Sequence, residues 1–231
     1  MRTLAALAVV VLAAGCVSTP NVPPMQYYVL GNGQEAASVR SASQRSGGVL
    51  VHPTSVSTFY DTQRLVFSRA EGQRAYYQFA SWTDRPGRAL SELLIRRLGA
   101  SSTTSGVKGD LILHTRLEEL YHDASANPGS VKIEVSAELV DAAGRLVGER
   151  QRFSRSVAAN AENAAAAVDA ANRAVRAVLD DIAAWLEGRR ARDARRPERE
   201  IEHQLRPHLS LQEKHRDIGA KQGKGRGRHA A

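Results

Sequence analysis

The chain has 231 residues, of which 42% are hydrophobic and 5% aromatic, so it is long and apolar enough to bury an aliphatic core and is not wholly disordered. Its formal net charge of +8 is concentrated at one end: residues 189–231 hold thirteen Lys and Arg against six Asp and Glu, a net of +7, and the rest of the chain carries only +1. A body this close to neutral gives no reason to expect nucleic-acid binding, and a single cysteine excludes an internal disulfide.

The first sixteen residues have the pattern of an export signal. One positive side chain, Arg2, precedes an unbroken apolar run of eleven residues from Leu4 to Ala14. As a helix this run reaches about 16 Å, whereas the hydrocarbon core of a bilayer is about 30 Å thick, so the pattern indicates a signal peptide and not a membrane span. The run ends in small residues before the single cysteine, in the order Leu12-Ala13-Ala14-Gly15-Cys16.

This ending resembles the lipobox of bacterial lipoproteins. The resemblance implies removal of residues 1–15 by cleavage between Gly15 and Cys16, and a lipid of the palmitate type on Cys16, since a thiolate is the nucleophile that accepts it. By resemblance to the sorting rule of enterobacterial lipoproteins, Val17, in place of an aspartate, favours anchoring at the outer membrane with the domain facing the periplasm. Residues 16–26 are rich in proline and serine and are expected to form a tether. The alternative is a soluble periplasmic protein with an incidental cysteine.

Residues 27–99 predict β-strands followed by a helix. Short β-prone runs lie at 27–30, 49–51, 65–67 and 75–79, and the last two flank Glu71-Gly72-Gln73, as in a hairpin with a glycine turn. We expect the helix to be capped by Thr83 or Asp84, to have Pro86 in its first turn and to end at Gly99. Its apolar face is formed by leucines at helical spacing: Leu90, Leu93, Leu94 and Leu98.

Residues 111–188 predict three further strands and a closing helix. Apolar and polar residues alternate over 111–118 and most clearly over 131–139, and a return strand is expected at 145–157 after turns at Asn127-Pro128-Gly129 and Ala143-Gly144. The closing helix, which Gly188 is expected to end, has an apolar stripe that we interpret as core packing, with a partner-binding coiled coil as the alternative. The sequence therefore predicts an α+β domain at 27–188, a mainly antiparallel sheet with two helices packed on one face.

The order of these features resembles the ABC-type transport auxiliary lipoprotein family, the PqiC-like proteins, over residues 1–188. The shared features follow the lipidated start: Tyr27-Tyr28-Val29-Leu30, an apolar strand before Pro53, Phe59-Tyr60-Asp61, Leu65-Val66-Phe67-Ser68-Arg69, and an aromatic strand ending at Trp82. The resemblance implies a non-enzymatic accessory subunit that needs no cofactor or metal. It also implies as partners an MCE-domain protein and the permease and ATPase of a system that moves lipids between membranes, with phospholipid and a homo-oligomer as further candidates.

Motifs of other functions are absent from the sequence, which has no GxSxG elbow, no HExxH pair and no P-loop. A lipid-anchored envelope hydrolase is one alternative, because His122 and Asp123 are expected in a loop near Ser125 and Ser130, although neighbours on an extended chain point to opposite sides. An outer-membrane assembly factor is another. His114 is expected on an exposed strand face.

Two further features have alternative interpretations. Trp82 is expected to pack in the core, with contact to lipid or a partner as the other interpretation. Residues 189–231 are predicted to be a disordered extension, because their glycine and charge content argues against a packed fold. The alternative for this basic tail is electrostatic attraction to anionic lipid headgroups.

Overall fold

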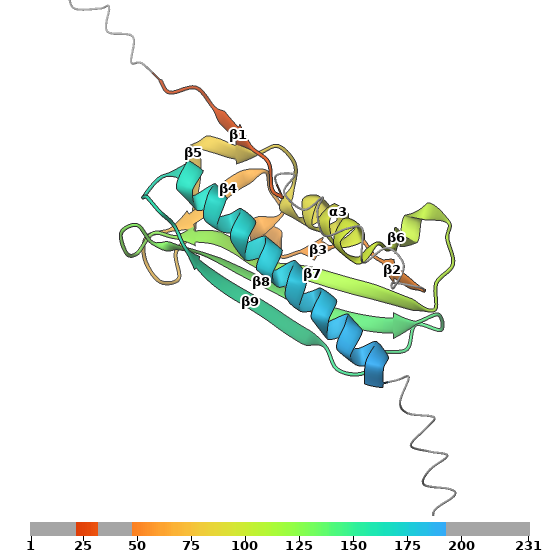
Figure 1. The fold of residues 1–231 in the computed structure, drawn as a ribbon. Coiled ribbons are helices and arrows are strands. Elements are labelled where there is room, and N and C mark those ends of the chain that lie inside the picture. Colours follow the sequence, from red (N-terminus) through yellow and green to blue (C-terminus); the bar gives the residue numbers. More distant parts are fainter. Residues whose placement is uncertain (1–21, 32–47, 193–231) are drawn as a thin grey trace, which may run out of the picture.

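The computed structural model describes residues 22–31 and 48–192 (Figure 1). The predicted signal peptide, the predicted lipid anchor at Cys16, the first part of the predicted tether at 16–21 and the tail after residue 192 lie outside the described residues. Residues 22–25, the end of the expected tether, are exposed and have no regular secondary structure before the first strand begins at Gln26.

A long strand, β7 (Leu111–Asp123), is the centre of a curled sheet. One of its sides pairs antiparallel with β8 (Ser130–Asp141), which pairs antiparallel with β9 (Gln151–Ala158). The Asn127-Pro128-Gly129 turn connects β7 to β8, as predicted. Every second residue of β8 is buried from Val131 to Leu139, which confirms the clearest alternation in the sequence.

The other side of β7 pairs in succession with β2 (Val49–Val51), β3 (Ser55–Val56) and β4 (Arg64–Ser68), always parallel. The described part of the sheet is completed at its margins by three strands: β5 (Ala75–Trp82), which forms the predicted hairpin with β4, β1 (Gln26–Tyr28), which pairs with β5, and β6 (Ser101–Ser102), which pairs with β2.

The α+β class is confirmed, but the prediction of a mainly antiparallel sheet is wrong. Five of the eight strand pairings among the described residues are parallel, so the sheet is mixed. Strands joined by short turns pair antiparallel, as the sequence suggested. The chain, however, passes through a helix between β5 and β7, and this crossover returns β7 in the same direction as β2, β3 and β4.

Both helices cover one face of the sheet, as predicted (Figure 1). The first, α3 (Pro86–Leu98), has Pro86 at its start and ends at Gly99 in the left-handed conformation. Neither predicted cap is correct, because the N-cap is Arg85 and makes no side-chain cap bond; Asp84 Oδ1 instead accepts a hydrogen bond from the Arg85 amide at 2.7 Å.

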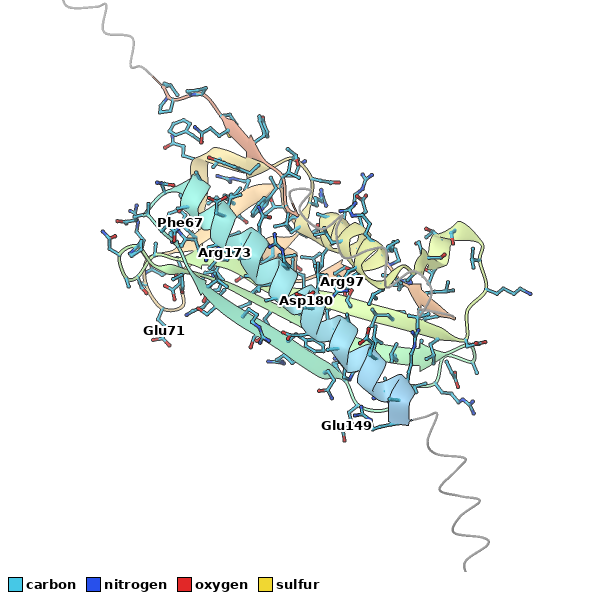
Figure 2. The ribbon with its side chains drawn as sticks, in the orientation of Figure 1. Phe67, Glu71, Arg97, Glu149, Arg173 and Asp180 are labelled. Atoms are coloured by element: carbon cyan, nitrogen blue, oxygen red, sulfur yellow. The ribbon has the colours of Figure 1, made fainter. Side chains whose placement is uncertain are left out.

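The closing helix begins at residue 164 and continues to 192 in the described part of the chain, so the prediction that Gly188 ends it is wrong. A glycine inside a helix costs only about 1 kcal/mol relative to alanine, which the flanking turns outweigh. Arg97 of α3 and Asp180 of the closing helix point toward one another in Figure 2, and Arg97 Nε lies 2.8 Å from Asp180 Oδ1. This ion pair joins the two helices across the layer.

The aliphatic core lies between the sheet and the helices. Trp82 is 5% exposed and belongs to this core, in agreement with the packing interpretation. The buried Asn172 of the closing helix accepts a hydrogen bond from the Gly31 amide at 2.8 Å. Gly31 has a φ of +76°, and a Cβ there would collide with Leu93, so glycine is required at this point. The segment after β1 is thereby fixed to both helices.

No helix within residues 22–31 and 48–192 combines the length and apolarity needed to span a bilayer.

Candidate functional site

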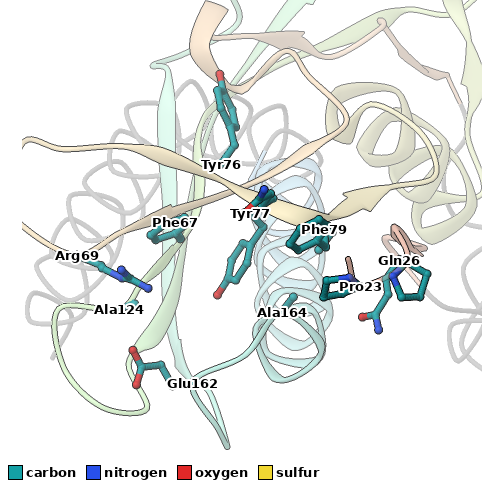
Figure 3. Close-up of a pocket in the computed structure, with 13 residues that line it drawn as sticks. Pro23, Gln26, Phe67, Arg69, Tyr76, Tyr77, Phe79, Ala124, Glu162 and Ala164 are labelled. Atoms are coloured by element: carbon teal, nitrogen blue, oxygen red, sulfur yellow. The ribbon is translucent and has the colours of Figure 1, made fainter. Parts of the chain in front are cut away.

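An open groove of about 540 Å³ lies at the end of the domain where residues 22–26 join the sheet (Figure 3). It is bounded by β5, by the end of β4, by the start of the closing helix and by the prolines that precede β1. We call it the aromatic groove, after the rings of Phe67, Tyr77 and Phe79; Tyr76 also borders it.

The aromatic wall follows from the β4–β5 hairpin. The Phe67 and Tyr77 rings contact each other with centroids 5.0 Å apart and a tilt of 54°. Successive side chains on a strand point to opposite faces, and Figure 3 shows Tyr76 pointing away from Tyr77. The hairpin therefore presents one set of aromatic rings to the groove and another to the opposite face of the sheet.

A buried histidine holds the Tyr77 ring in place. The Tyr77 hydroxyl lies 2.7 Å from His122 Nδ1, and His122 Nε2 lies 3.0 Å from the Pro128 carbonyl oxygen. That carbonyl can only accept, so Nε2–H donates to it, and in this tautomer Nδ1 accepts from the Tyr77 hydroxyl. Burial raises the pKa of Tyr77, so the hydroxyl stays protonated at neutral pH.

Two side chains of opposite charge lie at one end of the aromatic groove. The Arg69 guanidinium lies 5.3 Å from the centroid of Phe67, and Glu162 lies just before the closing helix. Their fields act in opposite directions on the Tyr77 hydroxyl, where Arg69 lowers the pKa and Glu162 raises it, both less strongly than burial does. Among the described residues neither charge has an ion-pair partner within 4.0 Å. The groove thus combines an apolar wall with two unneutralised charges.

A second hollow, of about 440 Å³, lies on the face of the sheet opposite the helices. We call it the charged hollow. Arg74 Nη2 lies 3.3 Å from Glu119 Oε1, and Lys132 Nζ lies 2.6 Å from Asp123 Oδ2. Hydrogen bonds, first from Lys132 and then from Ser125, lower the pKa of Asp123 to about 2. Each of these four charges is therefore neutralised within the hollow, whereas Glu71, which also lines it, is exposed and has no ion-pair partner within 4.0 Å among the described residues.

The residues considered for a hydrolase do not assemble into one. His122 is 2% exposed at the end of β7, not in a loop, and both its ring nitrogens are occupied. Asp123 points to the charged hollow and accepts from Ser125 Oγ at 2.6 Å, while Ser130 Oγ accepts from Ser156 Oγ at 3.2 Å. The expectation that His122 and Asp123 point apart is confirmed, and their expected loop location is wrong because β7 extends through both.

His114 lies on the face of β7 that points away from the core, as predicted, but it is half-buried and not exposed. Its ring lies against that of His52, with centroids 4.5 Å apart. The reason is the strand register: Val51 is paired with Leu113, so the next residues, His52 and His114, are neighbours across the two strands. Burial lowers the pKa of His114, and His52 lowers it further. In the part of the chain that the structure describes, no group of three or more His, Cys, Asp or Glu residues is placed to hold a metal ion.

Sequence reasoning missed the role of Phe67, Arg69, Tyr77 and Glu162. Phe67, Arg69 and Tyr77 fall in two of the segments on which the family resemblance rests, residues 65–69 and the aromatic strand ending at Trp82. That was a signal that these segments matter beyond the fold. No local pattern connects them to Glu162, because the closing helix begins far along the chain and reaches the hairpin only through tertiary packing.

Comparisons with known proteins identify a matching family and solved structures with a similar fold. The family model described as the ABC-type transport auxiliary lipoprotein component matches residues 28–183, more than half of the chain. A DUF330-family protein from Xanthomonas campestris has a similar fold, with a TM-score of 0.62 and 18% identity over 74% of this chain and 99% of that chain. The crystal structure of an uncharacterized protein gives a TM-score of 0.57 and 14% identity over 71% and 99% of the two chains. No curated protein matches the chain.

Proposed function

We propose, because the chain belongs to the ABC-type transport auxiliary lipoprotein family, that it is a lipid-anchored accessory subunit of a system that moves lipids between the membranes of the cell envelope. The family match is the observation that carries this proposal. The partners we propose are an MCE-domain protein and the permease and ATPase of the same system. The lipoprotein acts at the outer membrane, facing the periplasm, and is not itself an enzyme.

The position of the aromatic groove supports a role at the membrane surface. Val22 is the sixth residue after Cys16, and six fully extended residues span at most about 22 Å. A lipid on Cys16 therefore keeps this end of the domain close to the bilayer. Apolar side chains gather there, since four of the seven large hydrophobic residues that are exposed in the described part of the chain lie within residues 22–29: Val22, Met25, Tyr27 and Val29.

The anchor is tested with Cys16→Ser, with Ser18→Ala as the matched control. We expect the cysteine variant to lose labelling by a fatty-acid analogue, because it lacks the thiol that accepts the lipid. It should then leave the membrane fraction, because stable anchoring needs two or more acyl chains. The control variant should be labelled and retained as the unchanged protein is. Membrane retention of unlabelled Cys16→Ser would contradict the anchor.

The partnership is tested by co-purification of the full chain with the MCE-domain protein of the same organism. We expect association that persists when both proteins are released from membranes in detergent. An absence of association with that protein would contradict the transport role. Crosslinking only to an outer-membrane assembly complex would favour the assembly-factor alternative instead.

A further inference from the structure

We propose that the aromatic groove binds the headgroup and upper acyl segments of one zwitterionic phospholipid, with its phosphate at Arg69 and its ammonium at Glu162. This inference rests on the proposed function, because it names the class of lipid that the transport role would involve. It assigns the groove a ligand and goes beyond the family match, which identifies no binding site.

The charges of the groove match the two charges of such a headgroup. Arg69 and Glu162 both line the groove and both act electrostatically on the Tyr77 hydroxyl. Neither has an ion-pair partner within 4.0 Å among the described residues. A guanidinium is suited to bind phosphate oxygens through several donors, and a carboxylate accepts hydrogen bonds from a primary ammonium. An anionic lipid would satisfy only Arg69 and would leave Glu162 close to a like charge.

The groove is also polarised along its length. Figure 3 shows Arg69 and Glu162 at one end, and Phe79 and Pro23 at the other. The proline end is the one from which residues 16–22 lead to the anchor, so it faces the membrane if Cys16 is lipidated. A bound phospholipid would then lie with its headgroup in the domain and its acyl chains directed toward the bilayer.

The volume and rigidity of the groove suit a headgroup. Its 540 Å³ falls within the range of roughly 300–1,000 Å³ that small-molecule sites occupy, which accommodates a headgroup, the glycerol and the first acyl segments but not two whole chains. The hydrogen bond from Tyr77 to the buried His122 fixes the central ring before any ligand binds. A wall that is already ordered loses little conformational entropy on binding.

The proposed pairing of headgroup charges with Arg69 and Glu162 is tested with full-length protein and short-chain lipids below their micellar concentration. Binding is measured by native mass spectrometry and titration calorimetry. Dihexanoyl-phosphatidylethanolamine should bind with one lipid per chain and at least about tenfold more tightly than dihexanoyl-phosphatidylglycerol. Free phosphoethanolamine, which lacks the apolar part, should bind far more weakly than either. Absence of binding, or a preference for the anionic lipid, would overturn the proposal.

Variants separate the two charges. Arg69→Gln should weaken the binding of both lipids by about tenfold, whereas Glu162→Gln should weaken only phosphatidylethanolamine and so erase the preference. Glu162→Lys should reverse the preference, a gain that loss of folding cannot imitate. Lys108→Gln and Glu149→Gln are the matched controls, since both residues are exposed and do not line the groove, and Figure 2 shows Glu149 at the other end of the domain.

The same variants distinguish failure of this inference from failure of the proposed function. If Arg69→Gln and Glu162→Gln bind lipid as the unchanged protein does, while association with the MCE-domain protein is intact, only the groove assignment is wrong. If the unchanged protein binds phosphatidylethanolamine selectively but associates with no MCE-domain protein, the transport role is wrong and the lipid site stands.

Discussion

The aromatic groove and the charged hollow share only the end of β4, and they differ in how many of their charged side chains have an ion-pair partner. In the charged hollow, Arg74 pairs with Glu119 and Lys132 pairs with Asp123. In the aromatic groove, Arg69 and Glu162 have no such partners among the described residues. Paired charges contribute to the stability of the fold, whereas unpaired charges beside an apolar wall are available to a ligand.

Consecutive residues of a strand point to opposite faces of the sheet, so neighbours on β7 contribute to different sites. His122 points to the helix-covered side and holds Tyr77, while Asp123 points to the charged hollow and holds Lys132. The comparison therefore predicts that substitutions one residue apart, or of the same type on opposite faces, have different consequences.

The largest effect is expected for His122→Ala. The change removes a side chain that is 2% exposed and leaves the Tyr77 hydroxyl and the Pro128 carbonyl without their partner. We expect a loss of about 3 kcal/mol in the free energy of unfolding, measured by urea denaturation, against about 1 kcal/mol for Asp123→Asn. Equal losses for the two variants would show that the buried network is not what distinguishes the faces.

The next largest difference in stability is expected between substitutions of Arg74, in the charged hollow, and Arg69, in the aromatic groove. Arg74 donates to the Tyr60 hydroxyl at 2.9 Å, pairs with Glu119 and lies 3.7 Å from the centroid of Tyr121. We expect Arg74→Ala to lower the free energy of unfolding by about 2 kcal/mol and Arg69→Ala by less than about 0.5 kcal/mol. A larger loss at Arg69 would mean that its charge serves the fold and not a ligand.

A smaller effect is expected from acid, which should lower the free energy of unfolding by protonating Asp123 in the charged hollow. Lys132, together with Ser125, lowers the pKa of Asp123 from 3.8 to about 2, so the Asp123 carboxylate stabilises the fold above the unfolded pKa, and this contribution is lost as the pH falls through the folded pKa. Because Lys132 is 44% exposed and screened by solvent, we expect about 1 kcal/mol to be lost through this pair between about pH 4 and pH 2. Denaturation curves of Asp123→Asn should lack this part of the pH dependence, and an unchanged slope would contradict the assignment.

The smallest effect is expected at the His52–His114 contact, which belongs to neither hollow. Burial, then His52, lowers the pKa of His114, while Glu138 raises it. A histidine with a lowered folded pKa binds its proton more readily when unfolded, so stability falls as the pH drops below about 6.5. His114→Gln should flatten the pH dependence of unfolding between about pH 7 and pH 5. His52→Gln should flatten it only in part, because the larger cause, burial, is left in place.

The local elements were predictable because their determinants are local. The β4–β5 glycine turn, the Pro86 start and Gly99 end of α3, and the alternation from Val131 to Leu139 each depend on residues close together in sequence. The order of these elements was also sufficient to indicate the family, which the match over residues 28–183 then established. The direction of strand pairing was not predictable in the same way, since alternation is the same for parallel and antiparallel neighbours.

The sequence by itself determined the class of the domain, its helix-covered core and its family, because apolar spacing and turn residues act over a few positions at a time. Only the tertiary structure decided that the sheet is mixed, that His122 is buried against Tyr77, and that Arg69 and Glu162 share a groove. These three features depend on segments distant in the chain, which the crossover through α3 and the packing of the closing helix bring together.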